Sequence, residues 1–366
     1  MRHLNDTIER LRNAPRGFEP EPGDARTSNW MSLENDFSNP GNLKSWFYVP
    51  DAKGPLPLVV VLHGCTQSAL GYDRGTGWSA LAEKHHFAVL FPEQQRANNP
   101  NLCFNWFSPD DTRRGSGEVM SVRNMVAAMI DRYGIDSARV FVTGLSAGGA
   151  MAASLLASYP DVFAGGAIIA GLPAGAASTM AQAFDRMRGH GHLDATRSAD
   201  HVRQSSDHRG PWPMVSVWHG SADATVASSN AEAILAQWQN VHGVAAKPDR
   251  EQKIDGACHR QWQDGDGRIV IEDFRIPGMG HGTPIATAGK TAGGSPAPYI
   301  LDVGISSAWH SADQWGLLDP ELAGVEHAVQ HPDVPRSDAT KSTSWREPHA
   351  GIQHTIETAL RSAGLM

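Results

Sequence analysis

The stretch Thr143-Gly-Leu-Ser-Ala-Gly-Gly149 decides the predicted fold, because it places a serine between an apolar run and a run of helix-forming residues. A serine on a tight strand-to-helix turn needs small neighbours, since larger side chains would clash with a strained backbone. The pattern therefore predicts a turn that exposes the hydroxyl of Ser146 as a nucleophile. A chance glycine-rich turn is the alternative, and the flanking strand and helix patterns argue against it.

Short apolar runs alternate with helical patterns from Lys44 onward. The runs cover residues 58–62, 88–91, 139–143, 167–170 and 214–218. Continuous β-branched runs of this length suit strands buried on both faces of a parallel sheet. Apolar side chains at steps of three and four over residues 119–133 indicate an amphipathic crossover helix. We expect an α/β fold with a doubly wound, mostly parallel sheet, helices on both faces, and functional groups at the carboxyl ends of the strands.

The length predicts one catalytic domain over residues 44–366, since nothing in the composition requires a second core. Residues 1–43 are expected to form an N-terminal arm with a short helix. Residues 173–212 are interpreted as a partly helical excursion that could cap the site, and residues 268–276 as the last sheet strand. The polar residues 318–350 predict a surface loop, followed by a C-terminal helix over 352–363.

The composition excludes several classes of partner. The chain carries 31 basic and 39 acidic residues and no cluster of Lys or Arg that could follow a phosphate backbone, so we expect no nucleic acid partner. No apolar run is long enough to span a bilayer, and the first ten residues lack the apolar core of a secretory signal. We expect no membrane partner and a cytoplasmic location, with secretion of a processed form left open. The oligomeric state is also left open.

Three cysteines, Cys65, Cys103 and Cys258, make an odd count that argues against a dense disulfide framework. One disulfide between Cys103 and Cys258 remains open. Because no His-Glu-x-x-His pair and no Cys-x-x-Cys pair occurs, we expect neither a metal nor another cofactor.

An acid and a base follow the serine in the order that this type of fold uses. Asp223 ends the segment His219-Gly-Ser-Ala-Asp223 after a predicted strand, where its carboxylate can orient an imidazole. A cap for a helix over 231–241 is its alternative role, but that helix would begin too far downstream. Among 17 histidines, His281 lies in a Gly-Met-Gly-His-Gly turn directly after the last predicted strand and is the expected base. The other histidines considered as the base are expected to pack in the interior or to face solvent. They are His219, His310, His85 and His86.

Two backbone amides are expected to bind the oxyanion. One is the amide of Ala147, at the start of the helix after Ser146. The other is the amide of Cys65, in the loop Leu62-His-Gly-Cys-Thr66 after the first predicted strand. The alternative that the Cys65 thiol is itself a nucleophile lacks a neighbouring base or helix N-terminus. These residues together predict acyl transfer, in which His281 takes the proton of Ser146 and an acyl-enzyme is then hydrolysed.

With these residues in view, the chain resembles the polyhydroxybutyrate (PHB) depolymerase family of esterases, which also includes feruloyl and acetylxylan esterase-like members. The resemblance runs over about residues 44–316. It rests on seven ordered segments: His63-Gly-Cys-Thr-Gln67, Phe91-Pro-Glu-Gln94, Cys103-Phe-Asn-Trp-Phe107 with Gly117-Glu118, Gly144-Leu-Ser-Ala-Gly-Gly-Ala-Met151, Tyr159-Pro-Asp-Val-Phe-Ala164, His219-Gly-Ser-Ala-Asp223 and Gly278-Met-Gly-His-Gly-Thr-Pro284.

This resemblance implies the α/β-hydrolase fold and a serine esterase with Ser146, Asp223 and His281 at the triad positions. It further implies short-chain hydroxyalkanoate esters or other small acyl esters as substrates. Because the chain shows no signal peptide, linker or polymer-binding domain, we expect soluble oligomers or small esters rather than solid polymer. Feruloyl or acetylxylan esters, amide hydrolysis and a non-catalytic binding role are the alternatives. Trp106 and Trp309 are expected to wall the acyl pocket, with a core position as the alternative.

Overall fold

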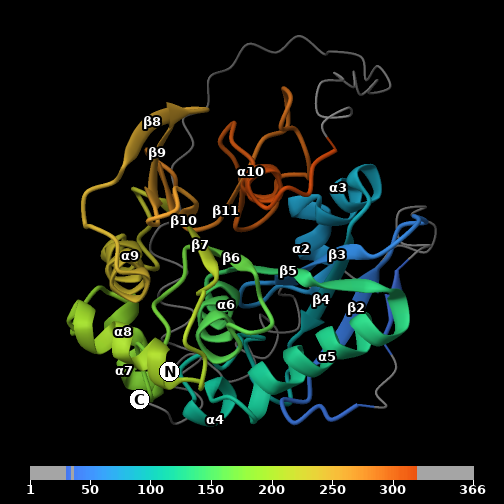
Figure 1. Ribbon diagram of the computed structural model, residues 1–366, viewed down its shortest axis with the longest axis horizontal. Coiled ribbons are helices and arrows are strands. Elements are labelled where there is room, and N and C mark those ends of the chain that lie inside the picture. Colours follow the sequence, from blue (N-terminus) through green and yellow to red (C-terminus); the bar gives the residue numbers. More distant parts are fainter. Residues whose placement is uncertain (1–29, 34–36, 320–366) are drawn as a thin grey trace, which may run out of the picture. The chain divides into compact units, whose positions relative to one another are not determined.

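A mixed sheet of ten strands organises the described residues, 30–33 and 37–319, of the computed structural model (Figure 1). In spatial order the strands are β1 (Met31–Ser32), β2 (Lys44–Tyr48), β4 (Ala88–Glu93), β3 (Leu56–Leu62), β5 (Ile135–Leu145), β6 (Gly165–Ile169), β7 (Met214–Gly220), β10 (Ile269–Ile276), β9 (Ala257–Gln263) and β8 (Arg250–Ile254). The six strands from β4 to β10 pair in parallel, and two antiparallel strands extend each edge. The predicted parallel sheet is therefore confirmed.

Helices cover both faces of this sheet (Figure 1). They are α2 (Ala69–Thr76), α3 (Trp78–His85), α4 (Pro109–Thr112), α5 (Gly117–Tyr133), α6 (Ala147–Ser158), α7 (Met180–Met187), α8 (Ala195–Gln204), α9 (Ser229–His242) and α10 (Ser307–Gln314). A separate pair of parallel strands, β11 (Thr283–Ile285) and β12 (Ile300–Asp302), follows β10 in the chain.

Strand β3 shows why the central runs are continuously apolar. Leu58, Val60 and Leu62 belong to one buried cluster, which includes residues of α5, α6, α8 and α9. The alternate residues Val59 and Val61 belong to a second cluster, which includes residues of α2, α3 and α10. Because successive strand side chains point to opposite faces, both sets must be apolar when both faces are covered.

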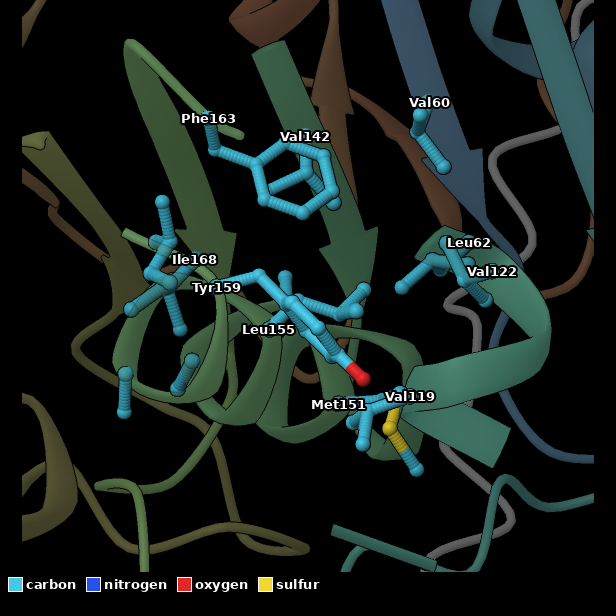
Figure 2. Packing of buried hydrophobic residues seen from close by; sticks show 14 of the residues in the cluster. Val60, Leu62, Val119, Val122, Val142, Met151, Leu155, Tyr159, Phe163 and Ile168 are labelled. Carbon is cyan, nitrogen blue, oxygen red and sulfur yellow. The ribbon is translucent and has the colours of Figure 1, made fainter. Parts of the chain in front are cut away.

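Helix α6 is buried along its whole length. Figure 2 shows Met151 and Leu155 of this helix among Val60, Val142 and Val119, which come from two strands and from α5. Seven of the twelve residues of α6 are alanine or glycine, and these small side chains let the helix lie close to the sheet. Burial of one leucine such as Leu155 contributes roughly 1.5 to 3 kcal/mol to folding. The turn that carries Ser146 is thus fixed to a rigid part of the core.

The boundaries of the domain differ in part from those predicted. Residues 31–32 form β1 and pair with β2, so the sheet begins before Lys44, inside the expected N-terminal arm. Contacts divide the chain into Met1–Gly324 and Val325–Met366. The predicted N-terminal helix, the C-terminal helix over 352–363 and nearly all of the surface loop over 318–350 lie outside the described residues.

The excursion over residues 173–212 is partly helical, as expected, and contains α7 and α8. The side chain of Gln237 in α9 bonds both oxygens of Ser198 in α8 and the backbone of Ala174, which joins the excursion to α9. Its role as a cap stays a prediction.

Candidate active site

Ser146 lies at the junction between β5 and α6 with φ 57° and ψ −115°. A positive φ is strained for a residue with a side chain, and it persists only where the surroundings enforce it. Here the amide of Ser146 donates to the carbonyl of Ile169 at 2.9 Å, and its carbonyl accepts from Ala150 at 2.9 Å. The turn therefore has the strained strand-to-helix geometry that the sequence predicts.

Gly148 allows the oxyanion loop, residues 63–66, to approach this turn. A Cβ at this position would lie 2.5 Å from the carbonyl oxygens of both Leu62 and His63. Both of those atoms belong to the backbone, so they could not yield without moving the loop. The glycine is thus required by a close approach between α6 and the end of β3.

Asp223 and His281 form a hydrogen-bonded pair beyond the carboxyl end of β7. The Nδ1 of His281 lies 2.7 Å from Oδ2 of Asp223, while Oδ1 accepts from the amides of Thr225 and Val226. Burial has the largest influence and would raise the pKa of Asp223, but the hydrogen bond and charge of His281, the Val226 amide and the nearby His219 together lower it below its ordinary value. The carboxylate is therefore held ionised beside the imidazole.

The loops that carry this pair are bonded directly to each other. The amide of Ala222 donates to the carbonyl of Met279 at 3.0 Å, and the amide of Gly278 donates to the hydroxyl of Ser221 at 2.9 Å. A Cβ at Gly220 would lie 2.2 Å from the Met279 carbonyl oxygen, so only glycine permits this contact. Two segments far apart in sequence thus hold Asp223 against His281.

His219 is a second imidazole near the same carboxylate. Its Nε2 lies 2.9 Å from the carbonyl of Val226 and 3.4 Å from Oδ2 of Asp223, while its Nδ1 is buried without a partner. Burial lowers the pKa of His219, so this ring is neutral. It is fully enclosed, whereas His281 is partly exposed, and it therefore packs as expected although it touches the triad.

The two amides expected to bind the oxyanion, those of Cys65 and Ala147, have no hydrogen-bond partner among the described residues. The neighbouring amide of Thr66 is occupied, since it donates to the carbonyl of Asn101 at 2.7 Å. Unpaired backbone donors at the start of a helix and in a nearby loop suit a site where negative charge develops.

The disulfide of the chain joins Cys65 to Cys103, and Cys258 is free. The open possibility of a Cys103–Cys258 disulfide is therefore wrong, because the loop after β3 packs against the segment that follows β4. The sulfur of Cys65 is also unavailable as a nucleophile. Since disulfides persist in oxidising compartments, the cysteine argument for the cytoplasm no longer holds, and that location stays a prediction.

The hydroxyl of Ser146 forms no hydrogen bond with another described residue. The structure thus pairs Asp223 with His281 by a hydrogen bond, whereas Ser146 is not hydrogen-bonded to His281. In enzymes without bound substrate, catalytic hydrogen bonds are often long and tighten when substrate arrives.

The two tryptophans expected at the pocket have different settings. Trp106 is 6% exposed and belongs to the same buried cluster as Ala147. Trp309 is half-buried in α10, where the ammonium of Lys290 lies 5.5 Å from its ring centre. The ring partner of His281 is Tyr299 rather than either tryptophan, and the place of Trp106 and Trp309 in the pocket stays a prediction.

Tyr299 is a site residue that the sequence analysis missed. Its ring lies edge-on to His281, with centroids 6.0 Å apart, and its backbone has φ 63°. The carbonyl of Tyr299 accepts from the amide of Thr283, two residues after the base. It follows an irregular, glycine-rich stretch, so neither periodicity nor a motif could have singled it out.

Among the described residues, no group of three His, Cys, Asp or Glu side chains is arranged to hold a metal ion. The same part of the chain has no helix that is both long and apolar enough to cross a membrane.

Comparisons with known proteins show the family of the chain. The family model described as "Esterase PHB depolymerase" matches residues 45–253. The chain is 43% identical over 291 residues to poly(3-hydroxyalkanoate) depolymerase C of Paucimonas lemoignei, covering 78% of this chain and 70% of the relative. It is 34% identical over 268 residues to the probable acetylxylan esterase A of Aspergillus clavatus, covering 71% and 86% of the two chains.

A solved structure, an acetyl xylan esterase from Aspergillus awamori, shares the fold with a TM-score of 0.67 at 24% identity. The alignment covers 79% of this chain and 99% of that one. The fold is therefore the α/β-hydrolase fold that the sequence predicts. On the family match and these relatives, the chain belongs to the PHB depolymerase family of esterases and is a carboxylic ester hydrolase.

Proposed function

We propose that the chain hydrolyses short hydroxyalkanoate esters or other small acyl esters through an acyl-enzyme on Ser146. The observation that carries the proposal is the 2.7 Å bond between His281 and Asp223, beyond the strand ends where the strained turn of Ser146 also lies. That bond occupies Nδ1 of the imidazole, which leaves Nε2 as the atom that can accept a proton.

In the first step, the Ser146 hydroxyl attacks the ester carbonyl while Nε2 of His281 takes its proton. The negative charge of Asp223 stabilises the imidazolium that forms. Nε2 then returns the proton to the leaving alcohol, and the acyl group stays on Ser146. Because the hydroxyl and the ring are not bonded in the free enzyme, this contact forms as substrate binds.

The amides of Cys65 and Ala147 receive the oxyanion in this step. Their lack of protein partners supports the role, since both donors are available without breaking an existing bond. One such donor contributes about 3 to 4 kcal/mol to lowering the barrier in comparable hydrolases. In the second step, His281 activates a water molecule against the acyl-enzyme, and the same amides receive the second oxyanion.

The similarity to a poly(3-hydroxyalkanoate) depolymerase supports hydroxyalkanoate oligomers as the first substrate class. The similarity to acetylxylan esterases supports acetyl esters of plant polysaccharides as a second candidate. The same triad serves both, so the difference must lie in the pocket around the acyl and alcohol groups.

Covalent labelling tests the nucleophile. A fluorophosphonate probe should label the wild-type protein and the control Ser178→Ala, whose serine lies in an exposed segment before α7, but not Ser146→Ala. Labelling that persists in Ser146→Ala, or no labelling of the wild type, would refute the mechanism.

A substrate panel tests the acyl class. Hydrolysis of 3-hydroxybutyrate dimers and trimers, p-nitrophenyl acetate and butyrate, acetylated xylan and methyl ferulate should be compared by kcat/KM. We expect the hydroxybutyrate oligomers to give the highest value. A higher value for acetylated xylan or for methyl ferulate would instead establish the plant-ester alternative.

A further inference from the structure

Glu118 is a fully buried carboxyl group outside the triad, in the first turn of the 17-residue helix α5. Its Oε1 accepts from the side-chain amides of Gln94 at 2.6 Å and Asn105 at 2.8 Å, and its Oε2 accepts from the backbone amide of Asn105 at 2.9 Å. A carboxylate at 0% exposure is unfavourable unless it is hydrogen-bonded, and three donors satisfy this one.

The donors to Glu118 belong to segment 94–105, which contacts the oxyanion loop at three points. The amide of Gln94 donates to Nε2 of His63 at 3.1 Å. Cys103 forms the disulfide with Cys65, and Asn101 accepts from Thr66.

Gln94 connects these points to Glu118. The same side-chain nitrogen that donates to the carboxylate also donates to the carbonyl of Cys103 at 3.0 Å. Both ends of the segment are thus bonded to one carboxyl group, through Gln94 at its start and through Asn105 at its end.

The amide of Cys65 has no partner among the described residues, so its orientation depends on the bonds that hold the loop around it. The carbonyl of Gly64, which shares a peptide plane with this amide, accepts from Nδ1 of His63 and from the amide of Gln67 within the loop. Segment 94–105 acts on this arrangement through the bond from Gln94 to His63, the disulfide to Cys65 and the bond from Thr66 to Asn101. Oxyanion donors act only when they are held within a few tenths of an ångström of the productive position.

We propose that Glu118 is a positioning residue that anchors segment 94–105 and thereby holds the Cys65 amide in the oxyanion hole. This inference rests on the proposed function. The ionised carboxylate can accept from all three donors. Protonation turns one oxygen into a donor that faces other donors, which loosens the anchor.

The charge state of Glu118 depends on pH in the working range of an enzyme. Burial, and then the charge of Asp111, raise the pKa of Glu118 to about 8, against the three hydrogen bonds that lower it. Asp111 is the charged group that acts on it among the described residues, while Gln94 and Asn105 are neutral. His63, reached through Gln94, has a pKa lowered by burial and stays uncharged over this range.

The test compares Glu118→Gln with the wild type by kcat and KM for p-nitrophenyl butyrate from pH 6 to 9. The glutamine side chain resembles the protonated acid, because its amide nitrogen is a donor that would face the donors of Gln94 and Asn105. We expect kcat to fall about 10- to 100-fold at pH 9 with little change in KM, and to differ little at pH 6. In the wild type, kcat should rise as pH increases through about 8, and this rise should be absent in Glu118→Gln.

An alkyl trifluoromethyl ketone provides a second readout, because its adduct with Ser146 carries an oxyanion in the hole. The affinity of this inhibitor for Glu118→Gln should be lower than for the wild type, by a factor similar to the loss of kcat at pH 9.

Glu272→Gln is the matched control. Glu272 is also buried and accepts from His259 and Gln261, but it lies in β10. It should leave both readouts unchanged. Asn105→Ala removes one donor at a half-buried position and should give a smaller loss in the same direction, even if Glu118→Gln fails to fold.

Wild-type kcat and inhibitor affinity in a folded Glu118→Gln protein would overturn the inference, and so would equal losses in Glu272→Gln. A kcat loss of the same size at pH 6 and pH 9 would also reject it, because it would show a merely structural effect. If Glu118→Gln does not fold, unchanged inhibitor affinity in Asn105→Ala would overturn it. Failure of the proposed function gives a different result: no hydrolysis and no fluorophosphonate labelling in the wild type.

Discussion

The carboxylate of Asp223 is bonded at both oxygens, to amides of its own turn on one side and to His281 on the other, 2.7 Å away. The bonds from Thr225 and Val226 fix the plane of the carboxylate independently of the imidazole. Oδ2 is therefore directed toward His281 by the local chain, and the loop contacts between residues 220–222 and 276–279 bring the ring to it.

Asp223→Asn should lower kcat by about 10³- to 10⁴-fold, because an amide in place of Oδ2 stabilises the wrong tautomer of His281. The remaining oxygen can still accept from the turn amides, so the fold should persist. The matched control is Asp255→Asn, which alters another His–Asp pair, with His310 at 3.1 Å, away from the nucleophile. Steady-state kinetics and circular dichroism of both variants check this. Near-normal turnover in Asp223→Asn would show that another group orients the base.

The sequence predicted the centre of the fold because its strands are covered on both faces. Residues 58–62 had to be apolar at every position, and this signal is strong. The nucleophile turn, Asp223 and His281 were predictable for a related reason, since each follows a recognisable strand. Glycines at close approaches, such as Gly148 and Gly220, mark the same places.

The edges of the sheet and the supports of the site were not predictable in this way. Strand β8 exposes most of its side chains and carries charges, so it has no apolar pattern. The partner of Cys65 depends on which loops the topology brings together, which cysteine spacing does not encode. Tyr299 and Glu118 likewise act through contacts with residues distant in sequence.

Gly148→Ala should lower kcat more than 10-fold and reduce stability, because the new Cβ would lie 2.5 Å from two backbone carbonyl oxygens. The oxyanion loop would have to move away from Ser146. Gly265→Ala serves as control, since its Cβ would meet nothing within 4 Å. Kinetics and thermal unfolding of the two variants give the comparison. An unchanged kcat in Gly148→Ala would mean that the loop tolerates displacement.

Cys103→Ser should destabilise the protein by roughly 4 kcal/mol, the loop-closure contribution for a separation of 38 residues. It should also lower kcat, since one of the bonds to the Cys65 loop is lost. Cys258→Ser, at the free cysteine, should change neither property. Chemical unfolding with and without a thiol reductant measures the effect: the reductant should lower the stability of the wild type to that of Cys103→Ser. No effect of the reductant would mean that the disulfide adds nothing to stability.

The buried histidines should make a contribution to stability that is lost as pH drops below about 6.5, because they are neutral in the folded protein, whereas the raised pKa of Glu118 and of Asp73 contributes in the opposite direction. Burial lowers the pKa of His242 from 6.5 to about 4, and it also lowers those of His63 and His219. Between pH 6.5 and 4, His242 is protonated in the unfolded chain but not in the folded protein. For one such group, the free energy of unfolding therefore falls by up to about 1.4 kcal/mol for each pH unit.

His242→Gln should therefore flatten the loss of stability between pH 6.5 and 4, whereas His86→Gln, at an exposed ring, should not. Urea unfolding of each variant at several pH values measures the slope. Equal slopes in the wild type and in His242→Gln would show that this ring does not contribute.

Tyr299 should affect turnover through its ring rather than its hydroxyl. The ring packs edge-on to His281, while the hydroxyl has no hydrogen-bond partner among the described residues. An aromatic pair of this geometry contributes about 0.5 to 1.5 kcal/mol, so Tyr299→Ala should lower kcat by about 2- to 12-fold. Tyr299→Phe keeps the ring and should retain wild-type kcat, and Tyr133→Ala at the end of α5 controls for loss of an aromatic elsewhere. Should Tyr299→Phe lose as much as Tyr299→Ala, the hydroxyl itself must contact the substrate.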